Sequence, residues 1–371
     1  MKDATHHGHA RTALVLSGGG ANGAYELGVM KALIAGLSPS THRRPLTPSA
    51  VAATSIGAFN GSVLLSNLDR SWPAAVDALE QLWVERMASP SVAVRNGVMR
   101  YRMNPIDWAN DVMQDPMGPA RDFAADAMFL ARDLTARVAG FVGSTSGLAG
   151  RVAELFDASQ FLTAEPSASL VQETVDGGRI RDLAGRVDFR VATTAWETGT
   201  LRVFENRDFT DDKAALIVRA SGALPGIFPA VPIGAEVFVD GGVVLNTPLS
   251  PAIQSGADVL HVIYLDPSPG AIPMRPLSSM VDAMSRMLVA SFAATMRRDL
   301  EVAAKVNADV KAGKDHHRRA IEIHLYRPVE DMGGALGMLD FHRPRITGLI
   351  ERGYRDAIGH DCKANGCLNL N

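Results

Sequence analysis

Ser55 lies in the segment VAATSIGAFNG, downstream of a glycine-rich loop that reads SGGGANGAYELG. A serine hydroxyl can serve as a nucleophile, and the backbone N–H groups of a glycine loop can hold the negative oxygen that develops when an ester carbonyl is attacked. The two segments together indicate acyl-transfer chemistry through a serine ester.

The residues around Ser55 favour an exposed position on a sharp turn. Ala53 and Gly57, two positions before and two positions after it, match the nucleophile-elbow pattern G-x-S-x-G with alanine in place of the first glycine. Small residues relieve crowding where a strand turns into a helix, and the start of a helix favours negative charge. A serine before a helix is also a common N-cap, so the glycine loop is what favours the catalytic interpretation.

The glycine loop admits two interpretations. Gly18, Gly20 and Gly23 satisfy the dinucleotide-binding pattern G-x-G-x-x-G, which expects an acidic residue about twenty positions later. No Asp or Glu occurs between Glu26 and Asp69, so that interpretation is disfavoured. Glycines at the start of a helix instead supply N–H groups that can approach an oxyanion closely.

A general base is expected at the end of a strand, because a strand holds a carboxylate rigidly. Asp240 ends the apolar run AEVFVD and is followed by Gly241 and Gly242. The same triplet is also a common turn sequence. Asp266 ends a second apolar run, but Pro267 after it is more typical of a structural turn.

Strand and helix patterns alternate along the chain, which predicts an α/β fold. Residues 12–16 form a buried strand pattern, and the glycine loop and a helix follow them. Residues 49–54 and the segment after Ser55 repeat this strand–turn–helix unit. Later strands are predicted in DFRVATTAWETGTLRVF, AEVFVDGG, DVLHVIYLD and AIEIHLYRP, with WETGT as a hairpin turn.

A mainly helical segment, from about residue 72 to about residue 174, interrupts this alternation. We interpret it as an insertion packed on the sheet, with a cap over the site or a lipid-facing surface as the alternative. The apolar residues that could form such a surface are Met113, Met117, Phe123, Met128, Phe129 and Phe141.

Two later segments have either a core or a surface interpretation. A methionine-rich helix face is predicted to contact the core rather than lipid, and it consists of Met280, Met284, Met287, Leu288 and Phe292. The basic run from Lys311 to Arg319 is expected to be a solvated connection, with binding of anionic lipid head groups as the alternative.

Composition restricts the class of protein. A chain of 371 residues with 47% apolar residues can bury a sizeable core, whereas a net charge of -3 and a pI of ≈ 6.4 do not favour nucleic acid as a partner. No apolar run has the length of a membrane span, and no secretory signal is recognised. We therefore expect a cytoplasmic protein whose contact with membranes is peripheral.

Cys362 and Cys367 are the two cysteines of the chain. They do not form a disulfide framework, which fits a reducing compartment. His360 beside them gives HDCKANGC a faint likeness to a metal site, but a zinc site needs four ligands and no second pair lies nearby in the sequence. We therefore expect a short polar tail over residues 361–371 and no metal.

Several segments together resemble the patatin-like phospholipase family. They extend from about residue 12 to about residue 357 and occur in the order that the family has them: SGGGANGAYELGV, TSIGAFNGS, RASGALPGIFPAV, VDGGVVLNTP and FHRPRITGLIERGYRDA. The joint presence of the loop, the elbow and the D-G-G motif is highly specific.

The resemblance implies a three-layer α/β/α sandwich with a mainly parallel central sheet and a helical insertion after the nucleophile helix. We expect a single domain over residues 1–371, with a catalytic core at about 12–255 and a C-terminal strand and helices at about 256–360. The implied substrate is a lipid acyl ester, such as a phospholipid, and the implied chemistry needs neither a metal nor an organic cofactor.

The resemblance also assigns roles to residues. It implies a Ser-Asp dyad of Ser55 and Asp240, with an oxyanion hole formed by the N–H groups of Gly18, Gly19 and Gly20. Two residues depart from the family pattern. Ala53 replaces the first elbow glycine, which is a conservative change. Asn22 stands where a basic residue is common and removes a positive charge near the site.

Two other functions remain open. A Ser-His-Asp esterase of the α/β-hydrolase type would use His261, His324 or His342, which follow Asp240 in the chain. Ser55 lies early for that fold, and the first two histidines fall inside strand patterns that are typical of packed core residues. A non-catalytic lipid-binding protein could keep the same fold, although retention of the serine, the aspartate and the loop glycines argues against it.

Overall fold

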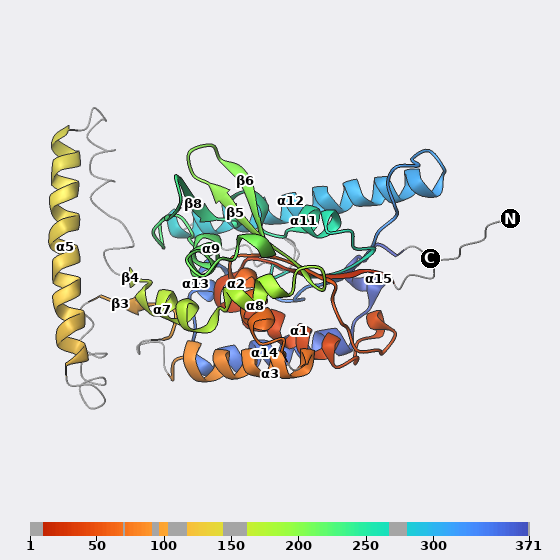
Figure 1. Ribbon diagram of the computed structural model, residues 1–371, viewed down its shortest axis with the longest axis horizontal. Helices are drawn as coiled ribbons and strands as arrows, with labels where there is room; N and C mark the ends of the chain where they lie inside the picture. The colour runs from red at the N-terminus through yellow and green to blue at the C-terminus, as the bar shows by residue number, and fades with distance from the viewer. Residues whose placement is uncertain are drawn as a thin grey trace.

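An eight-stranded sheet forms the centre of the computed structural model, which describes residues 10–69, 71–90, 96–102, 117–143, 162–266 and 280–369 (Figure 1). The strand order is β10-β9-β1-β2-β5-β8-β7, and β6 pairs with β5. The strands of this sheet are β1 (Thr12–Leu16), β2 (Ala50–Thr54), β5 (Asp188–Ala195), β6 (Thr200–Glu205), β7 (Val231–Ile233), β8 (Glu236–Asp240), β9 (Val259–Ile263) and β10 (Glu322–Tyr326).

The sheet is parallel from β10 through β9, β1 and β2 to β5. β6 and β8 pair with β5 in the antiparallel sense, and β7 pairs with β8 in the same way. The turn between β5 and β6 is the WETGT segment, so the predicted hairpin is confirmed. The sheet is therefore mainly parallel with an antiparallel edge.

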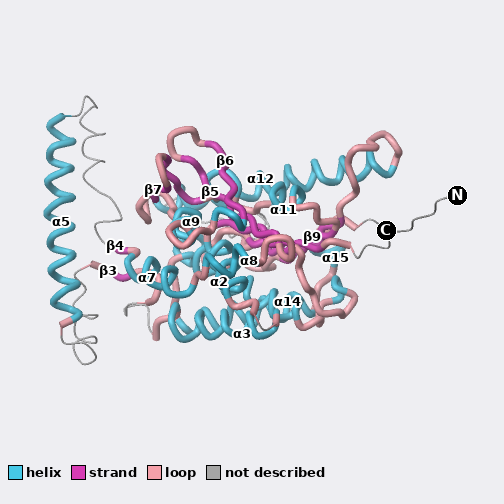
Figure 2. The backbone as a smooth tube through the Cα atoms, viewed as in Figure 1, coloured by secondary structure: helices cyan, strands magenta, loops and turns pink. Residues whose placement is uncertain are grey.

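Helices cover both faces of the sheet (Figure 2). The side chains of β1 alternate between the two faces. Leu14 and Leu16 pack with α1 (Gly23–Ile34), α2 (Ile56–Ser66) and α14 (Arg343–Ile358), while Ala13 and Val15 pack with α11 (Leu249–Gln254) and α12 (Met280–Lys311). Strands buried on both faces read as continuous apolar runs, which is what residues 12–16 and 50–53 show. The predicted three-layer α/β/α sandwich is confirmed.

The described helices lie at α1 (Gly23–Ile34), α2 (Ile56–Ser66), α3 (Trp72–Gln81), α5 (Gly118–Gly143), α7 (Glu165–Thr174), α8 (Gly177–Asp182), α9 (Ala214–Ser221), α10 (Gly242–Leu245), α11 (Leu249–Gln254), α12 (Met280–Lys311), α13 (Gly334–Met338), α14 (Arg343–Ile358) and α15 (Cys362–Asn365).

Two glycines allow α1 and α14 to pack in close contact. A Cβ atom on Gly28 would lie 2.0 Å from the carbonyl oxygen of Ile350, and one on Gly353 would lie 2.1 Å from that of Tyr25. Glycine lets the two backbones approach at these points. This contact fixes α14 beside the loop that begins α1.

The inserted segment does not pack on the sheet as a whole. α3 packs against α1 and α2, whereas α5 stands apart from the sheet (Figure 1). The interpretation of a sheet-packed insertion is therefore wrong for α5. Met117, Phe123 and Met128 are 64%, 55% and 59% exposed, while Met113 and the side chain of Phe141 lie outside the part of the chain that the structure describes.

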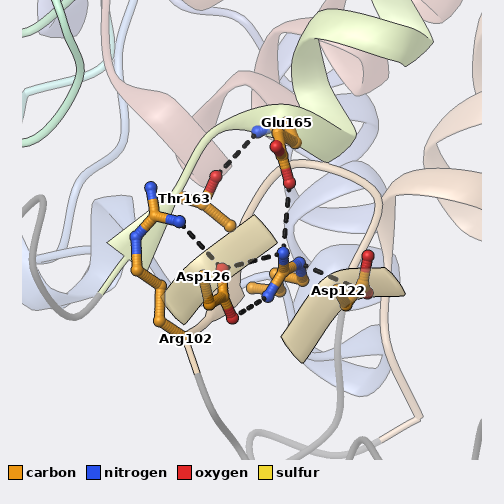
Figure 3. Close-up of polar contacts among 6 residues, drawn as sticks. Arg102, Asp122, Asp126, Thr163 and Glu165 are labelled. Carbon is orange, nitrogen blue, oxygen red and sulfur yellow. Dashed lines mark hydrogen bonds and ion pairs between the residues drawn. The ribbon is translucent and has the colours of Figure 1, made fainter. Parts of the chain in front are cut away.

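Ion pairs attach α5 to a short two-stranded sheet of β3 (Arg100–Tyr101) and β4 (Leu162–Thr163). Asp126 of α5 is buried and accepts hydrogen bonds from the guanidinium groups of Arg100 and Arg102 at 2.7 and 2.8 Å (Figure 3). The Arg102 guanidinium also lies 3.8 Å from the centre of the Phe129 ring. Among the described residues, the ion pairs of Asp126 and the contact of Arg102 with Phe129 thus connect α5 to the short sheet.

The methionine-rich helix faces solvent in part. Met287 of α12 is 63% exposed, so the prediction that it contacts the core is wrong, whereas Met296, nine residues later and thus on the opposite side of the helix, is buried. The side chains of Met280, Met284 and Leu288 lie outside the described part of the chain.

The basic run from Lys311 to Arg319 is largely exposed, which confirms a solvated connection. None of the helices in the described ranges has both the length and the apolar character needed to cross a membrane.

Candidate active site

The register of the sheet brings Ser55 and Asp240 together. β2 pairs with β5 as far as Thr54 opposite Ala192, and β8 pairs with the continuation of β5 starting at Asp240 opposite Thr193. Because β8 is antiparallel to β5, the C-terminal ends of β2 and β8 meet along the same strand. Ser55 directly follows the last residue of β2, and Asp240 is the last residue of β8. The nucleophile candidate and the base candidate therefore lie close together, although they are far apart in the chain.

Ser55 lies on the sharp turn that the elbow pattern predicts. It precedes α2 and has φ 55° and ψ -123°, in a region that non-glycine residues rarely adopt. A Cβ atom on Gly57 would lie 2.6 Å from the carbonyl oxygen of Leu16, so glycine is required at that position. Ala53 is fully buried in the core, so the departure from glycine there is accommodated by packing.

The Ser55 hydroxyl donates a hydrogen bond to Asp240 Oδ2 at 2.7 Å. The other carboxylate oxygen, Oδ1, accepts the N–H of Gly242 at 2.7 Å. Asp240 is buried, and burial raises the pKa of its carboxyl to about 6, against the lowering effect of the hydrogen bonds from Ser55 and Gly242. A carboxylate with a raised pKa is a stronger base toward a serine hydroxyl than an exposed one.

The D-G-G motif has a separate reason for each glycine. A Cβ atom on Gly241 would lie 2.4 Å from the carbonyl oxygen of Ala192, so only glycine allows the backbone at this position to lie so close to β5. Gly242 donates its N–H to the Asp240 carboxylate, and a Cβ atom there would lie 2.8 Å from Asn246 Oδ1 and 3.0 Å from Asp240 Oδ1. The motif is therefore more than a turn sequence in this fold.

Ser221 positions the elbow, and sequence reasoning assigned it no role. Its hydroxyl accepts the N–H of Ser55 at 2.8 Å and donates to the carbonyl oxygen of Ala192 at 2.7 Å. It is fully buried at the end of α9, within the segment RASGALPGIFPAV. That segment was recognisable from the sequence, but the contact with Ser55 depends on tertiary structure.

The three glycines of the loop have different surroundings. The N–H of Gly18 donates to the carbonyl oxygen of Asn246 at 3.1 Å, and Asn246 Nδ2 donates back to the Gly18 carbonyl at 3.2 Å. Gly18 thus fixes the loop to the end of α10, and its N–H is engaged. Gly19 and Gly20 line the cavity beside Ser55.

Asn22 has a cationic partner from a distant part of the chain. Its Oδ1 accepts a hydrogen bond from Arg345 Nη2 at 2.7 Å, and Arg345 also donates to the carbonyl oxygens of Asp340 and Met332. Arg345 lies on α14, which the close contact with α1 holds beside this loop. The positive charge that Asn22 lacks is therefore supplied to the loop by another helix.

A largely apolar cavity of ≈ 200 Å³ opens at Ser55 and Asp240. Its walls come from the elbow, from α7 and α9 and the loop after α9, from α12 and from the segment before α14. The lining residues include Gly19, Gly20, Ser55, Ile56, Phe59, Met87, Leu170, Val171, Val218, Arg219, Leu224, Ile227, Phe228, Asp240, Phe292, Met338 and Phe341. Arg219 is the cation among the described residues that line it.

The histidines considered from the sequence lie elsewhere. His261 and His324 are buried inside β9 and β10, which confirms that they are packed residues, and His342 precedes α14. No histidine is among the described residues that line the cavity, and neither is Asp266. The Ser55 hydroxyl donates to Asp240 instead.

Comparison with known proteins gives a family match over most of the fold. Residues 14–253 match the family described as patatin-like phospholipase. Triacylglycerol lipase SDP1L of Arabidopsis thaliana is 37% identical over 79 residues, which are 21% of this chain and 8% of that protein. The chain thus matches only a small part of the curated relative.

Two crystal structures are similar at low sequence identity. VipD from Legionella pneumophila is 13% identical, with a TM-score of 0.39, 96% of this chain covered and 67% of that chain covered. The type III effector protein ExoU is 14% identical, with a TM-score of 0.34, 95% of this chain covered and 52% of that chain covered. The strand order of the sheet and the helices packed on both of its faces define the fold of this chain.

Proposed function

This chain belongs to the patatin-like phospholipase family, and from that premise we propose that it is a serine acyl hydrolase that cleaves fatty-acyl ester bonds of lipids, with Ser55 as nucleophile and Asp240 as general base. The observation that carries the proposal is the 2.7 Å hydrogen bond from the Ser55 hydroxyl to the buried Asp240 carboxylate at an apolar cavity.

The proposed reaction has two half-reactions. Asp240 takes the Ser55 proton as the serine oxygen bonds to the ester carbonyl carbon, and the protonated carboxyl then gives that proton to the departing alcohol oxygen, leaving an acyl-enzyme. Water next loses a proton to Asp240 as it attacks the acyl-enzyme. Release of the fatty acid returns the proton to Ser55.

The oxyanion of each tetrahedral intermediate is proposed to be held by the N–H groups of Gly19 and Gly20. Both residues line the cavity beside Ser55, whereas the Gly18 N–H is engaged by Asn246. Loss of one such donor typically costs about 3 kcal/mol of transition-state stabilisation. Gly18 is assigned the role of anchoring the loop.

An ester with an anionic head group is the proposed substrate class, which favours phospholipids or lysophospholipids over neutral glycerides. Support comes from Arg219, a half-buried cation on the wall of an otherwise apolar cavity. A guanidinium in such surroundings attracts a phosphate more strongly than one in water does. The Arg219→Ala variant should lose more activity on phospholipid than on a neutral ester, and the exposed Arg207→Ala variant is the matched control.

Peripheral contact with a membrane is also proposed, and its support is the set of exposed apolar side chains of the α5 region, namely Met117, Phe123 and Met128. Apolar side chains of this kind can enter the boundary between head groups and acyl chains. Replacement of all three by serine should reduce co-sedimentation with phospholipid vesicles. Unchanged co-sedimentation would remove this part of the proposal.

Product analysis tests the function as a whole. The wild type, Ser55→Ala and Asp240→Asn should be incubated with vesicles of mixed phospholipids and glycerides, and the released fatty acids and lysolipids measured by mass spectrometry. The proposal predicts fatty-acid release by the wild type alone. Binding to vesicles without release of any acyl product would instead support a non-catalytic lipid-binding protein.

A further inference from the structure

A second chemically active cluster lies away from the cavity, at the C-terminal segment. It consists of His324 of β10, His360 after α14, Cys362 at the start of α15 and Cys367 beyond it. One ligand atom from each of these four residues lies within 4.8 Å of all the others, and both histidines are buried. We propose that the cluster is a structural zinc site with a Cys2His2 ligand set.

The separations within the cluster fit a tetrahedral ion. Cys362 Sγ lies 3.4 Å from His324 Nδ1 and 3.4 Å from His360 Nε2, and Cys367 Sγ lies 3.4 Å from His360 Nε2. With Zn–S bonds of about 2.3 Å and Zn–N bonds of about 2.0 to 2.1 Å, tetrahedral geometry places sulfur and nitrogen about 3.6 Å apart. The side chains therefore need only small movements to surround one ion.

The donor set selects the metal. Two thiolates and two imidazoles in a tetrahedral arrangement suit zinc, whereas magnesium and calcium prefer oxygen ligands. Four protein ligands leave no open position on the ion, which is typical of a structural rather than a catalytic zinc site.

Neighbouring groups orient the ligands as they do in metal sites. His324 Nε2 lies 3.2 Å from Glu322 Oε1, so the Nε2–H donates a hydrogen bond to the carboxylate and leaves Nδ1 for the metal. The backbone N–H of Leu325 donates to Cys367 Sγ at 3.2 Å.

The site would attach the chain end to an edge of the sheet. β10 is the outermost strand at its end of the sheet, and α15 packs against it. Ile323 and Leu368 exchange two backbone hydrogen bonds of 2.9 Å. Zinc would therefore stabilise the segment that covers an otherwise exposed strand edge. Sequence reasoning found only three ligands, because His324 is distant in the chain and falls inside a strand pattern.

Zinc content alone does not test the proposal, because His6, His7 and His9 can also bind metal ions. The direct test uses the reactivity of the two thiols and the absorption spectrum of Co²⁺ substituted for zinc. In wild type with one equivalent of Zn²⁺, both thiols should resist a disulfide reagent until a strong chelator is added. Co²⁺ should give the visible bands of a tetrahedral site together with thiolate charge transfer.

Variants separate the ligands from their surroundings. Cys362→Ser and Cys367→Ser should each lose the tetrahedral thiolate spectrum, whereas His317→Ala, at an exposed histidine of the basic run, should retain it. Glu322→Gln should weaken zinc binding about 10- to 100-fold, as other losses of a ligand's carboxylate partner do. A chelator should lower the unfolding temperature of the wild type and have no such effect on Cys362→Ser.

Two results would overturn the site: thiols that react at the same rate with and without Zn²⁺, or a Cys362–Cys367 disulfide in protein isolated from a reducing cytosol. Because the thiol assay uses the wild-type chain, it decides the question even if the cysteine variants fail to fold. Its outcome is independent of whether Ser55 is catalytic.

Discussion

Replacing Asp240 by asparagine should stabilise the folded protein near neutral pH while it removes ester hydrolysis. The carboxyl is buried, and its pKa in the folded protein is about 6 against an ordinary value of 3.8. Between about pH 4 and about pH 6 the folded state therefore holds a proton that the unfolded state has already released, and above about pH 6 the folded state carries a buried charge. An asparagine side chain has nearly the same shape and does not ionise, so it avoids the cost of a buried charge.

The size of the effect follows from the two pKa values. Their difference of about 2.2, at about 1.4 kcal/mol for each pH unit, corresponds to about 3 kcal/mol. Because the pKa is raised in the folded state, the stability that the neutral carboxyl contributes is complete below about pH 4 and is lost as the pH rises through about 6. Between about pH 5 and about pH 8 the wild type should lose about 1.4 kcal/mol relative to the variant.

Denaturant unfolding of the two proteins at several pH values measures this difference. The advantage of Asp240→Asn over the wild type should grow as the pH rises across that window, and the Asp77→Asn variant, at an exposed aspartate, is the matched control. A difference between Asp240→Asn and the wild type that does not change with pH would refute the reasoning. An advantage of Asp240→Asn over the wild type that shrinks as the pH rises would also refute it.

Other predictions concern the elbow and its base. Ser55→Gly and Ser55→Ala should both be inactive. The glycine variant should be more stable than the alanine variant by about 1 kcal/mol, because φ 55° strains any residue that has a side chain. Equal unfolding free energies of the two variants would show that the turn is unstrained. Ser221→Ala should lower the free energy of unfolding by about 1 to 3 kcal/mol and should lower kcat more than it changes KM, because the buried N–H of Ser55 loses its acceptor. The pH profile of kcat/KM should rise to a plateau with an apparent pKa of about 6. Its acid limb should barely move with temperature, because a carboxyl ionises with little heat, and a limb that shifts as an imidazole does would point to a histidine base.

Local motifs made part of the site predictable. The elbow at Ser55 and the strand end at Asp240 are each encoded within a few neighbouring residues, because the turn geometry depends on Gly57 and on Gly241 directly beside them. The pairing of the two residues is set by the register of β5, which no local pattern contains. The family resemblance, rather than residue spacing, supplied that pairing in advance.

Contacts between distant elements were not predictable from local patterns. Asn246 engages the Gly18 N–H, and Arg345 supplies a cation to Asn22 across most of the chain. The helical periodicity around Met287 was read correctly as a helix, but periodicity alone does not say which face meets the core. Likewise, α5 has the pattern of an ordinary helix, and that pattern reveals neither its ion pairs at Asp126 nor its position apart from the sheet.

Covalent labelling of Ser55 tests the central claim most directly. Wild-type protein, Ser55→Ala and Asp240→Asn should be treated with a fluorophosphonate ester in the presence of lipid and detergent, and the modified peptide identified by mass spectrometry. The proposed dyad predicts labelling of the wild type at Ser55, none of Ser55→Ala, and strongly slowed labelling of Asp240→Asn. Wild-type protein that remains unlabelled, or that is labelled equally fast without the Asp240 carboxylate, would contradict it.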